Sequence, residues 1–299
     1  MKLLKGKNIA DKIISELKRK ITEEKIKPGL AVILVGKNSA SEIYANLKGK
    51  AAKKIGIGFY LFKYGNRASE NDIIGKIKEL NADKKISGII VQLPLPKKLN
   101  TQNIIKAIDP KKDADGFHPE NLKLFLQGKE GVKPVFPMAI VKISETIPKV
   151  QPSKNLRLNL RQKAVIIANS EMFGKIMLVI LEKKGISTER ILLKKLDQTD
   201  YYTRRRPTLS VEELKKIKNA DIVISALGIP GFIKGSMIKK NAVIIDGGIA
   251  KKGKRVMGDA DYKSVKNIAS YLSPVPGGVG PVTVACLLEN VCMLAKKKI

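Results

Sequence analysis

The 299-residue sequence is poor in aromatic residues, cysteine and histidine, and it has no tryptophan. Only 5% of its residues are aromatic, which argues against a surface that stacks nucleic-acid bases. Its two cysteines, Cys286 and Cys292, lie six residues apart on one expected helix and point to different faces, so we expect buried thiols rather than a disulfide. His118 is the only histidine, and because Pro119 follows it we interpret it as loop scaffolding rather than as a general base. We expect no metal cofactor.

Long apolar runs and acidic residues are also scarce. No apolar run approaches the roughly 18 residues of a membrane span, and the N-terminus lacks the apolar segment of a signal peptide. With 43% hydrophobic residues, we expect a soluble cytoplasmic protein with a real core. The 58 Lys and Arg residues outnumber the 27 Asp and Glu residues, for a formal net charge of +31. That charge suits nucleic acids or small polyanions, but most lysines fall on polar faces of expected helices, as in residues 48–54 and 215–218, which favours compositional bias.

Hydrophobic patterning predicts two successive sets of βαβ units, and this length favours two domains. The first set is expected to contain, in chain order, a helix from residue 8, a strand at 30–35, a helix at 41–55, a strand at 58–64, a helix from a Ser69 and Asp72 capping box to residue 80, and a strand at 86–93. The second set is expected to contain a linking helix at 138–147, strands at 163–168, 222–226 and 242–246, helices at 172–184 and from a Ser210 and Glu213 capping box to residue 218, and a closing helix at 281–297. This order predicts mostly parallel sheets.

The segment at residues 273–283 reads SPVPGGVGPVT and holds three prolines and three glycines. Proline fixes the backbone dihedral φ, and glycine permits close approach of a ligand to the backbone. We therefore interpret this segment as a rigid, ligand-contacting loop rather than as a plain connector.

A tyrosine and a lysine, Tyr44 and Lys48, are four residues apart and share one face of an expected helix. A lysine can carry protons if its pKa falls, and a tyrosine ring can stack on a planar heterocycle. Taken alone, this pair on a lysine-rich helix is more often a solvated face.

A glutamine at the end of a buried strand gives that pair a context. Residues 89–96 read IIVQLPLP, so the strand ends at Gln92. Ligands of open α/β sheets bind at the carboxyl ends of strands, where an amide can both donate to and accept from a neighbouring amine. Downstream, KDADGFHPEN places Asp113 and Asp115 in a loop that is either a polar turn or a ligand site.

The first strand-to-helix turn of the second set reads AVIIANSEMFGKI from residue 164. It has one glycine, Gly174, where a dinucleotide fingerprint needs three, so by itself it is a weak indication of a nucleotide site. Further on, TRRRPT at residues 203–208 could grip a phosphate, or it could be a solvated basic loop.

Five motifs together resemble one enzyme family. They are Tyr44-xxx-Lys48, VQLPLP, KDADGFHP, GDADY at residue 258 and PVPGGVGPVTVA, and they resemble the bifunctional methylenetetrahydrofolate dehydrogenase/methenyltetrahydrofolate cyclohydrolase family in the family's order. The resemblance implies two α/β domains with the active site in the cleft between them. Residues 1–135 and 275–299 would form a folate-binding catalytic domain, and residues 136–274 a Rossmann-like domain with a parallel sheet that binds NADP, with NAD as the alternative.

The resemblance also implies an activity and its residues. The enzyme would oxidise 5,10-methylenetetrahydrofolate to 5,10-methenyltetrahydrofolate and hydrolyse this to 10-formyltetrahydrofolate. Lys48 would be the key catalytic group, Gln92 would tune it, Tyr44 would stack on the folate and Asp115 would hydrogen-bond the pterin edge. Further substrate-binding residues would be Val91, Leu93, Pro276, Gly277, Gly278, Val279 and Gly280; the cofactor-binding residues would be Ala168, Asn169, Ser170 and Ile249. The implied partners are tetrahydrofolate derivatives, polyglutamylated forms included, and a second copy of the chain in a homodimer that serves purine biosynthesis.

The expected cofactor turn departs from the family at two positions. Where the family has a glycine and often an arginine, this chain has Ala168, which adds a Cβ beside the pyrophosphate, and Asn169, which removes a cation for a 2′-phosphate. We hypothesise that Arg204, Arg205 and Arg206 replace that cation and preserve NADP use. The alternatives are a cyclohydrolase that has lost its dehydrogenase activity, and a basic nucleic-acid-binding protein on this scaffold.

Overall fold

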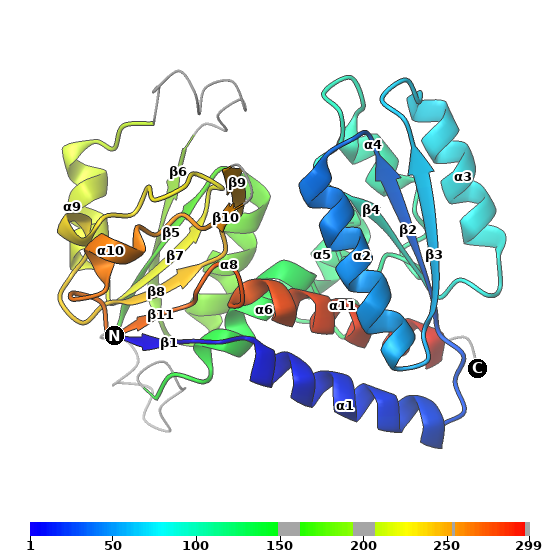
Figure 1. The fold of residues 1–299 in the computed structure, drawn as a ribbon, viewed down its shortest axis with the longest axis horizontal. Helices are drawn as coiled ribbons and strands as arrows, with labels where there is room; N and C mark the ends of the chain where they lie inside the picture. Colours follow the sequence, from blue (N-terminus) through cyan, green and yellow to red (C-terminus); the bar gives the residue numbers. More distant parts are fainter. Residues whose placement is uncertain (149–161, 194–206, 253–254, 297–299) are drawn as a thin grey trace. The chain divides into compact units, whose positions relative to one another are not determined.

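The fold consists of two compact units, shown in Figure 1. The computed structural model describes residues 1–148, 162–193, 207–252 and 255–296. One unit comprises Ala10–Met138 and Thr283–Ile299 and is called here the three-stranded unit after its sheet; the other comprises Met1–Ile9 and Ala139–Val282 and is called the six-stranded unit. Both sheets are parallel, which confirms the predicted pair of α/β domains. The residue limits predicted for the two functional domains stay predictions.

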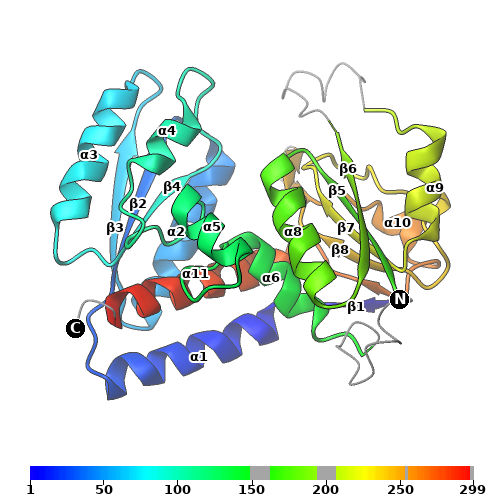
Figure 2. The ribbon, with the colours of Figure 1, turned by 180° about the vertical axis from the view of Figure 1, so that it is seen from behind.

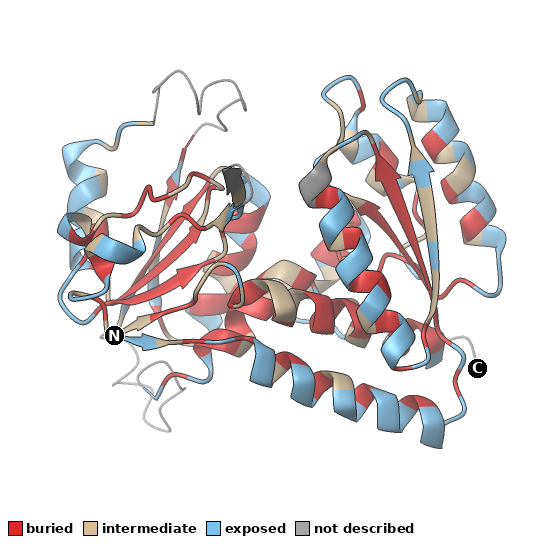
Figure 3. Ribbon diagram, in the orientation of Figure 1, coloured by how far each residue is buried: buried red, intermediate tan, exposed pale blue. Residues whose placement is uncertain are grey.

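The three-stranded unit is built around one buried strand. The sheet has the order β3-β2-β4, with β2 (Gly29–Val35) between β3 (Gly58–Tyr64) and β4 (Gly88–Gln92), and every residue of β2 is buried (Figure 3). Alternate residues of β2 face opposite sides of the sheet. Ala31, Ile33 and Val35 pack with the apolar residues of α3 (Glu70–Ala82) and α4 (Thr101–Lys106), and α2 (Ser39–Lys54) packs on β2 and β3.

Local sequence rules set the helix ends in this unit. Ser69 and Asp72 form the predicted capping box of α3, in which each side chain accepts a backbone N–H of the other residue. The other helices that reach into it are α1 (Lys7–Glu23), α5 (Pro119–Leu126), α6 (Val135–Ser144) and α11 (Val279–Lys296).

Helix α11 is long and apolar enough, with a mean hydropathy of 1.4 over 18 residues, to match a membrane span, but 61% of that window is buried inside the fold. It carries Cys286 and Cys292, which are buried free thiols as predicted. Burial raises the pKa of the Cys292 thiol to about 12, so this thiol stays protonated at neutral pH.

The six-stranded unit has the order β1-β11-β8-β7-β5-β6. Its strands are β1 (Lys2–Leu3), β5 (Lys163–Ala168), β6 (Ser187–Leu192), β7 (Ile222–Ala226), β8 (Val243–Asp246) and β11 (Tyr271–Leu272). Helix α8 (Glu171–Lys183) covers one face, and α9 (Val211–Asn219), opened by the predicted Ser210 and Glu213 capping box, covers the other together with α10 (Tyr262–Val265), as Figures 1 and 2 show. The short elements η1 (Gly235–Met237), β9 (Ala250–Lys252) and β10 (Arg255–Met257) complete the unit.

The order of these strands creates a switch point. From β5 the chain passes to β6 on one side and then to β7 on the other side of β5. The loops that follow β5 and β7 therefore leave the same edge of the sheet in opposite directions, which is where open α/β sheets bind their ligands.

Candidate functional site

A buried lysine and a glutamine form the centre of the site in the three-stranded unit. The Lys48 ammonium on α2 donates a hydrogen bond of 2.9 Å to Oε1 of Gln92, the last residue of β4. The Gln92 amide then donates to the Leu93 carbonyl at 2.9 Å, so its orientation is fixed from both ends. The predicted role of Gln92, which is to accept from an amine while it donates elsewhere, matches this geometry.

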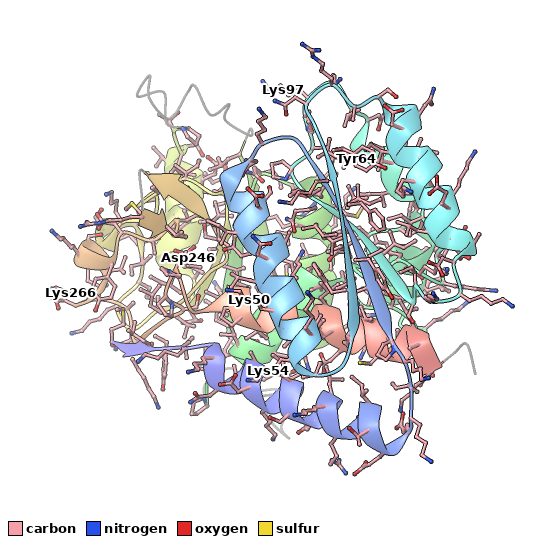
Figure 4. All side chains as sticks on the ribbon, turned by 45° about the vertical axis from the view of Figure 1, so that its right-hand side comes forward. Lys50, Lys54, Tyr64, Lys97, Asp246 and Lys266 are labelled. Atoms are coloured by element: carbon pink, nitrogen blue, oxygen red, sulfur yellow. The ribbon has the colours of Figure 1, made fainter. Side chains whose placement is uncertain are left out.

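Lys48 differs from its neighbours on α2 in burial. Lys50, Lys53 and Lys54 are exposed, and Figure 4 labels Lys50 and Lys54, whereas Lys48 is only 8% exposed. The interpretation of residues 48–54 as a polar face was therefore wrong at Lys48. Burial lowers the pKa of Lys48, and the charge of Asp115 partly opposes that shift. A larger share of this amine is neutral near pH 7 than of an exposed lysine, so it can accept a proton.

Asp115 and Tyr44 lie in the same unit as this lysine. Burial raises the pKa of Asp115, and the charge of Lys48 acts in the opposite direction. Tyr44 is partly buried, and burial raises the pKa of its phenol, which stays protonated. A small cavity of about 10 Å³ is lined by the predicted residues Val91, Leu93 and Asp115 together with Asp113 and neighbouring apolar side chains.

The loop that carries Asp115 is held by Asp113. The Asp113 carboxylate accepts the backbone N–H groups of Gly116 at 3.1 Å and His118 at 2.8 Å, and the Asn121 amide at 3.0 Å. Gly116 has a φ of +72°, and a Cβ there would lie 2.6 Å from the Lys133 carbonyl oxygen, so only glycine fits. His118 caps α5 by accepting from Glu120 N–H through Nδ1, in agreement with its predicted scaffolding role. Asp113 is thus structural, which leaves Asp115 for a ligand.

Two further residues that the sequence analysis did not single out hold this loop. The Lys112 ammonium donates to the Leu80 and Asp83 carbonyls at the end of α3, at 2.8 and 2.7 Å. The Asn290 amide on α11 donates to the Ala114 and Lys133 carbonyls, both at 2.8 Å. Lys112 was visible in the KDADGFHP motif, but nothing in the sequence pairs Asn290 with a loop 176 residues away.

The proline- and glycine-rich loop belongs to the six-stranded unit. The Val275–Pro276 peptide bond is cis, and Gly277 has a φ of +101°. The loop closes on itself through Gly278 N–H to the Pro274 carbonyl at 2.7 Å, and Gly6 N–H donates to the Gly277 carbonyl at 2.9 Å. These bonds agree with one fixed backbone shape for the predicted ligand-contacting residues Pro276, Gly277, Gly278, Val279 and Gly280.

The predicted cofactor residues gather around the switch point. Ala168 ends β5 fully buried, Asn169 donates from its amide to the Leu227 carbonyl after β7 at 2.8 Å, and Ser170 caps α8 by accepting Phe173 N–H at 3.3 Å. Ile249 is exposed in the loop after β8. Arg204, Arg205 and Arg206 lie outside the described residues. A larger cavity of about 290 Å³ lies at the amino ends of β5 and β6. Open α/β sheets bind their ligands at the carboxyl ends of the strands, so we do not assign this cavity to the cofactor.

A pair of buried aspartates holds the loops of this edge, and the sequence analysis missed it. Asp259 accepts Ser225 Oγ–H at 2.6 Å and the backbone N–H groups of Leu227 and Ile229 at 2.8 and 2.6 Å. Asp246, labelled in Figure 4, accepts the backbone N–H groups of Gly248, Asp259 and Ala260. Burial, and then the charge of Asp259, raise the pKa of Asp246 to about 7. The available indication was an aspartate at the end of a buried strand before two glycines, together with the GDADY motif.

Comparison with known families assigns both units. The model of the tetrahydrofolate dehydrogenase/cyclohydrolase catalytic domain matches residues 4–115, and the model of the NAD(P)-binding domain of the same enzymes matches residues 149–299. Among described relatives, "Bifunctional protein FolD" of Pelagibacter ubique is 38% identical over 97% of this chain and 96% of its own, and that of Helicobacter pylori is 38% identical over 99% and 96%.

Solved structures agree with this assignment. The bifunctional enzyme FolD, methylenetetrahydrofolate dehydrogenase/cyclohydrolase, from Campylobacter jejuni superposes with a TM-score of 0.83 and 33% identity, covering 100% of both chains. The FolD of Trypanosoma brucei, solved with NADP and an inhibitor, gives a TM-score of 0.83 and 25% identity over 99% of this chain and 97% of its own.

Proposed function

Because this chain belongs to the tetrahydrofolate dehydrogenase/cyclohydrolase family, we propose that Lys48 is the proton carrier of its hydrolytic reaction and that Gln92 positions it. The protein is a bifunctional enzyme that oxidises 5,10-methylenetetrahydrofolate to 5,10-methenyltetrahydrofolate and hydrolyses the latter to 10-formyltetrahydrofolate. The two alternatives, a cyclohydrolase alone and a nucleic-acid-binding protein, are not favoured by these relatives. The observation that carries the proposal is the buried Lys48 ammonium, hydrogen-bonded to Gln92 at 2.9 Å and lowered in pKa.

The hydrolysis needs three proton transfers, and we propose that Lys48 carries two of them. The methenyl carbon is cationic between two nitrogens, and water adds to it as its O–H proton leaves. The neutral amine of Lys48 accepts that proton, and the ammonium then gives it to the ring nitrogen whose bond to carbon breaks. As that bond breaks, the added hydroxyl loses its own proton to water and becomes the formyl C=O on the other nitrogen, so one proton is released in each turnover. Gln92 holds the amine where both transfers can occur.

Asp115 and Tyr44 have binding roles in this proposal. The carboxyl of Asp115 accepts hydrogen bonds from the N–H groups of the pterin edge. Asp113 and Asn290 hold the loop that carries Asp115 and so fix its position. The Tyr44 ring stacks on the folate ring system. Val91 and Leu93 supply surrounding apolar contacts.

The oxidation needs alignment rather than a base. The nitrogen lone pair next to the methylene carbon expels the hydride, and a nicotinamide cofactor would supply the acceptor for it. The residues present fit that cofactor, because α8 begins at the switch point and Arg190 beside it has a buried, unpartnered nitrogen. Ala168, Asn169, Ser170 and Ile249 would hold it, and NADP is our proposal for its identity.

We further propose a cytoplasmic homodimer whose product donates formyl groups to purine biosynthesis and whose substrates include polyglutamylated folates. The net charge of +31 would attract these polyanions. Light scattering on the purified protein should give twice the 32.9 kDa mass of one chain, whereas a single-chain mass would contradict the dimer.

An absorbance assay tests the two activities. Loss of methenyltetrahydrofolate absorbance reports hydrolysis, and NADPH or NADH formation from methylenetetrahydrofolate reports oxidation. We expect both activities, with a higher kcat/KM for NADP than for NAD. Hydrolysis without oxidation under either cofactor would contradict the dehydrogenase assignment, and equal kcat/KM values would contradict only the choice of NADP.

A further inference from the structure

Arg190, in the six-stranded unit, has a buried guanidinium nitrogen without a hydrogen-bond acceptor. Its Nη1 is the one buried side-chain nitrogen or oxygen, among the residues that the structure describes, that lacks a hydrogen-bond partner. A buried donor without a partner is unfavourable, and more so when it is charged. The described residues therefore provide no acceptor for Arg190 Nη1.

No carboxylate in the described part of the chain is bonded to Arg190 Nη1. The Arg190 side chain runs beside the start of α8, where a Cβ added to Gly174 would lie 3.3 Å from its Cδ and 3.8 Å from Nη1. The nearby Glu171 is exposed and forms an ion pair with Lys175 at 2.8 Å. Lys175 chiefly lowers the pKa of Glu171, and the charge of Arg190 adds to that shift. The amino end of a helix repels cations and attracts anions. Among the described residues, Arg190 Nη1 therefore has no anionic acceptor.

The place of Arg190 in the sheet identifies the acceptor. Arg190 lies two residues before the end of β6, an edge strand, and the last residue of β6, Leu192, pairs with Ala168 of the cofactor turn. In doubly wound folds the end of this second strand lies beside the adenine ribose, where its 2′ substituent is recognised. Arg190 is only partly buried, so its long side chain can turn toward this edge.

We propose that Arg190 is the specificity-determining residue that binds the 2′-phosphate of NADP. It supplies a planar, permanently charged fork for phosphate, which Asn169 does not have. Because Gly174 has no side chain, the Arg190 side chain can lie beside α8 without steric crowding. This inference rests on the proposed use of NADP and assigns it to one side chain.

The test compares two fragments of the cofactors on the full-length protein. The two fragments 2′,5′-ADP and 5′-AMP differ by the 2′-phosphate, so calorimetric titration with each gives the contribution of this phosphate to binding affinity. We expect the wild type to prefer 2′,5′-ADP, and Arg190→Met to lose roughly 10- to 100-fold in affinity for 2′,5′-ADP with little change for 5′-AMP. Arg190→Lys should retain part of the preference. The apo melting temperature of Arg190→Met should stay at or above the wild-type value, because an unpartnered donor is removed.

The control is Arg19→Met, which removes an exposed arginine of α1 that pairs with Glu23 and lowers the net charge equally. If Arg190→Met keeps the full preference, or loses affinity for both fragments equally, the assignment of Arg190 is wrong while NADP use stands. If the wild type itself shows no preference, both Arg190 and NADP use are overturned. Hydrolysis of methenyltetrahydrofolate, measured on the same samples, reports the folate chemistry separately.

Discussion

Each unit buries charged groups, and one from each unit, Lys48 and Asp259, are stabilised in opposite ways. In the three-stranded unit the Lys48 ammonium makes one hydrogen bond to a described side chain, that of Gln92. In the six-stranded unit the Asp259 carboxylate accepts from the Ser225 hydroxyl and the Leu227 and Ile229 backbone N–H groups. A charge with many fixed partners holds structure, whereas a charge with few partners is kept available for a substrate.

The pKa directions follow the same contrast. Burial lowers the pKa of Lys48, so the neutral amine is accessible for chemistry. The pair of Asp246 and Asp259 shares a buried site where burial and mutual repulsion raise the pKa of Asp246 to about 7, while backbone N–H groups oppose the shift. The pair thus ties together the loops that follow β7 and β8, and the loop after β8 carries Ile249, a cofactor contact in our proposal.

The largest expected effect is on the hydrolysis reaction. Lys48→Met removes the proton carrier, so methenyltetrahydrofolate hydrolysis should fall on the order of 10³-fold, which is the usual contribution of a positioned acid or base. Oxidation of methylenetetrahydrofolate should persist within about tenfold, because hydride transfer needs alignment and no base. Lys50→Met, an exposed lysine on the same helix, should leave both rates unchanged. Hydrolysis by Lys48→Met within tenfold of wild type would show that another group carries the proton.

The second effect concerns stability at the aspartate pair. Asp259→Ala leaves the buried donors of Ser225, Leu227 and Ile229 without an acceptor, so the free energy of unfolding should fall by about 3 kcal/mol. Asp261→Ala, a partly exposed carboxylate paired with Lys234, should cost under about 1 kcal/mol. Urea unfolding measures both. Equal small losses would mean that Asp259 does not hold these loops.

Removal of the Lys48 charge should have a smaller effect on the free energy of unfolding, and it should be a gain rather than a loss. Because its pKa in the folded protein lies below the usual 10.5, the unfolded chain binds more protons there, and wild-type stability rises with pH up to that value. Lys48→Met should therefore raise the free energy of unfolding by about 1 kcal/mol at pH 6 to 7. The gain should shrink as the pH approaches 10.5, and Lys50→Met should give no such pH dependence. A gain that is constant with pH would rule out burial of the charge as its cause.

The smallest effect is the pH dependence of the aspartate pair. The raised pKa of Asp246 contributes stability that is complete below its ordinary value of 3.8 and is lost as the pH rises through about 7. Asp246→Asn cannot ionise, so the difference in unfolding free energy between wild type and variant should change on the order of 1 kcal/mol from pH 6 to pH 8. Melting curves across this range measure it, and parallel curves would contradict the shared ionisation.

Local patterns in the sequence predicted many of the helices and strands, whereas the proposed folate site came from the resemblance to a known family. Alternation and apolar runs located the strands at residues 58–64, 163–168 and 222–226 with the bounds that the structure gives, because buried parallel strands are continuously apolar. Two capping boxes were found from spacing alone. Gln92 was recognised because its strand ends before two prolines, and its pairing with Lys48 was implied by the resemblance to the family.

Contacts between distant segments could not be predicted in the same way. Ser225 and Asp259 meet across 34 residues, and Asn290 reaches Ala114 across 176, so no local spacing records either contact. Arg190 was one basic residue among 58 until the structure showed its unpartnered nitrogen. Burial of a polar group depends on which strands become neighbours, and this information lies in the topology.

The pH–rate profile of methenyltetrahydrofolate hydrolysis, with the Lys48→Met rate subtracted as background, tests the central claim about Lys48 most directly. The account predicts a rate that rises with pH through an inflection below 10.5, as the buried ammonium loses its proton. Since the charge of Asp115 raises the pKa of Lys48, Asp115→Asn should move that inflection to lower pH. An inflection that stays in place or moves to higher pH in Asp115→Asn would contradict the assignment of the titrating group to Lys48.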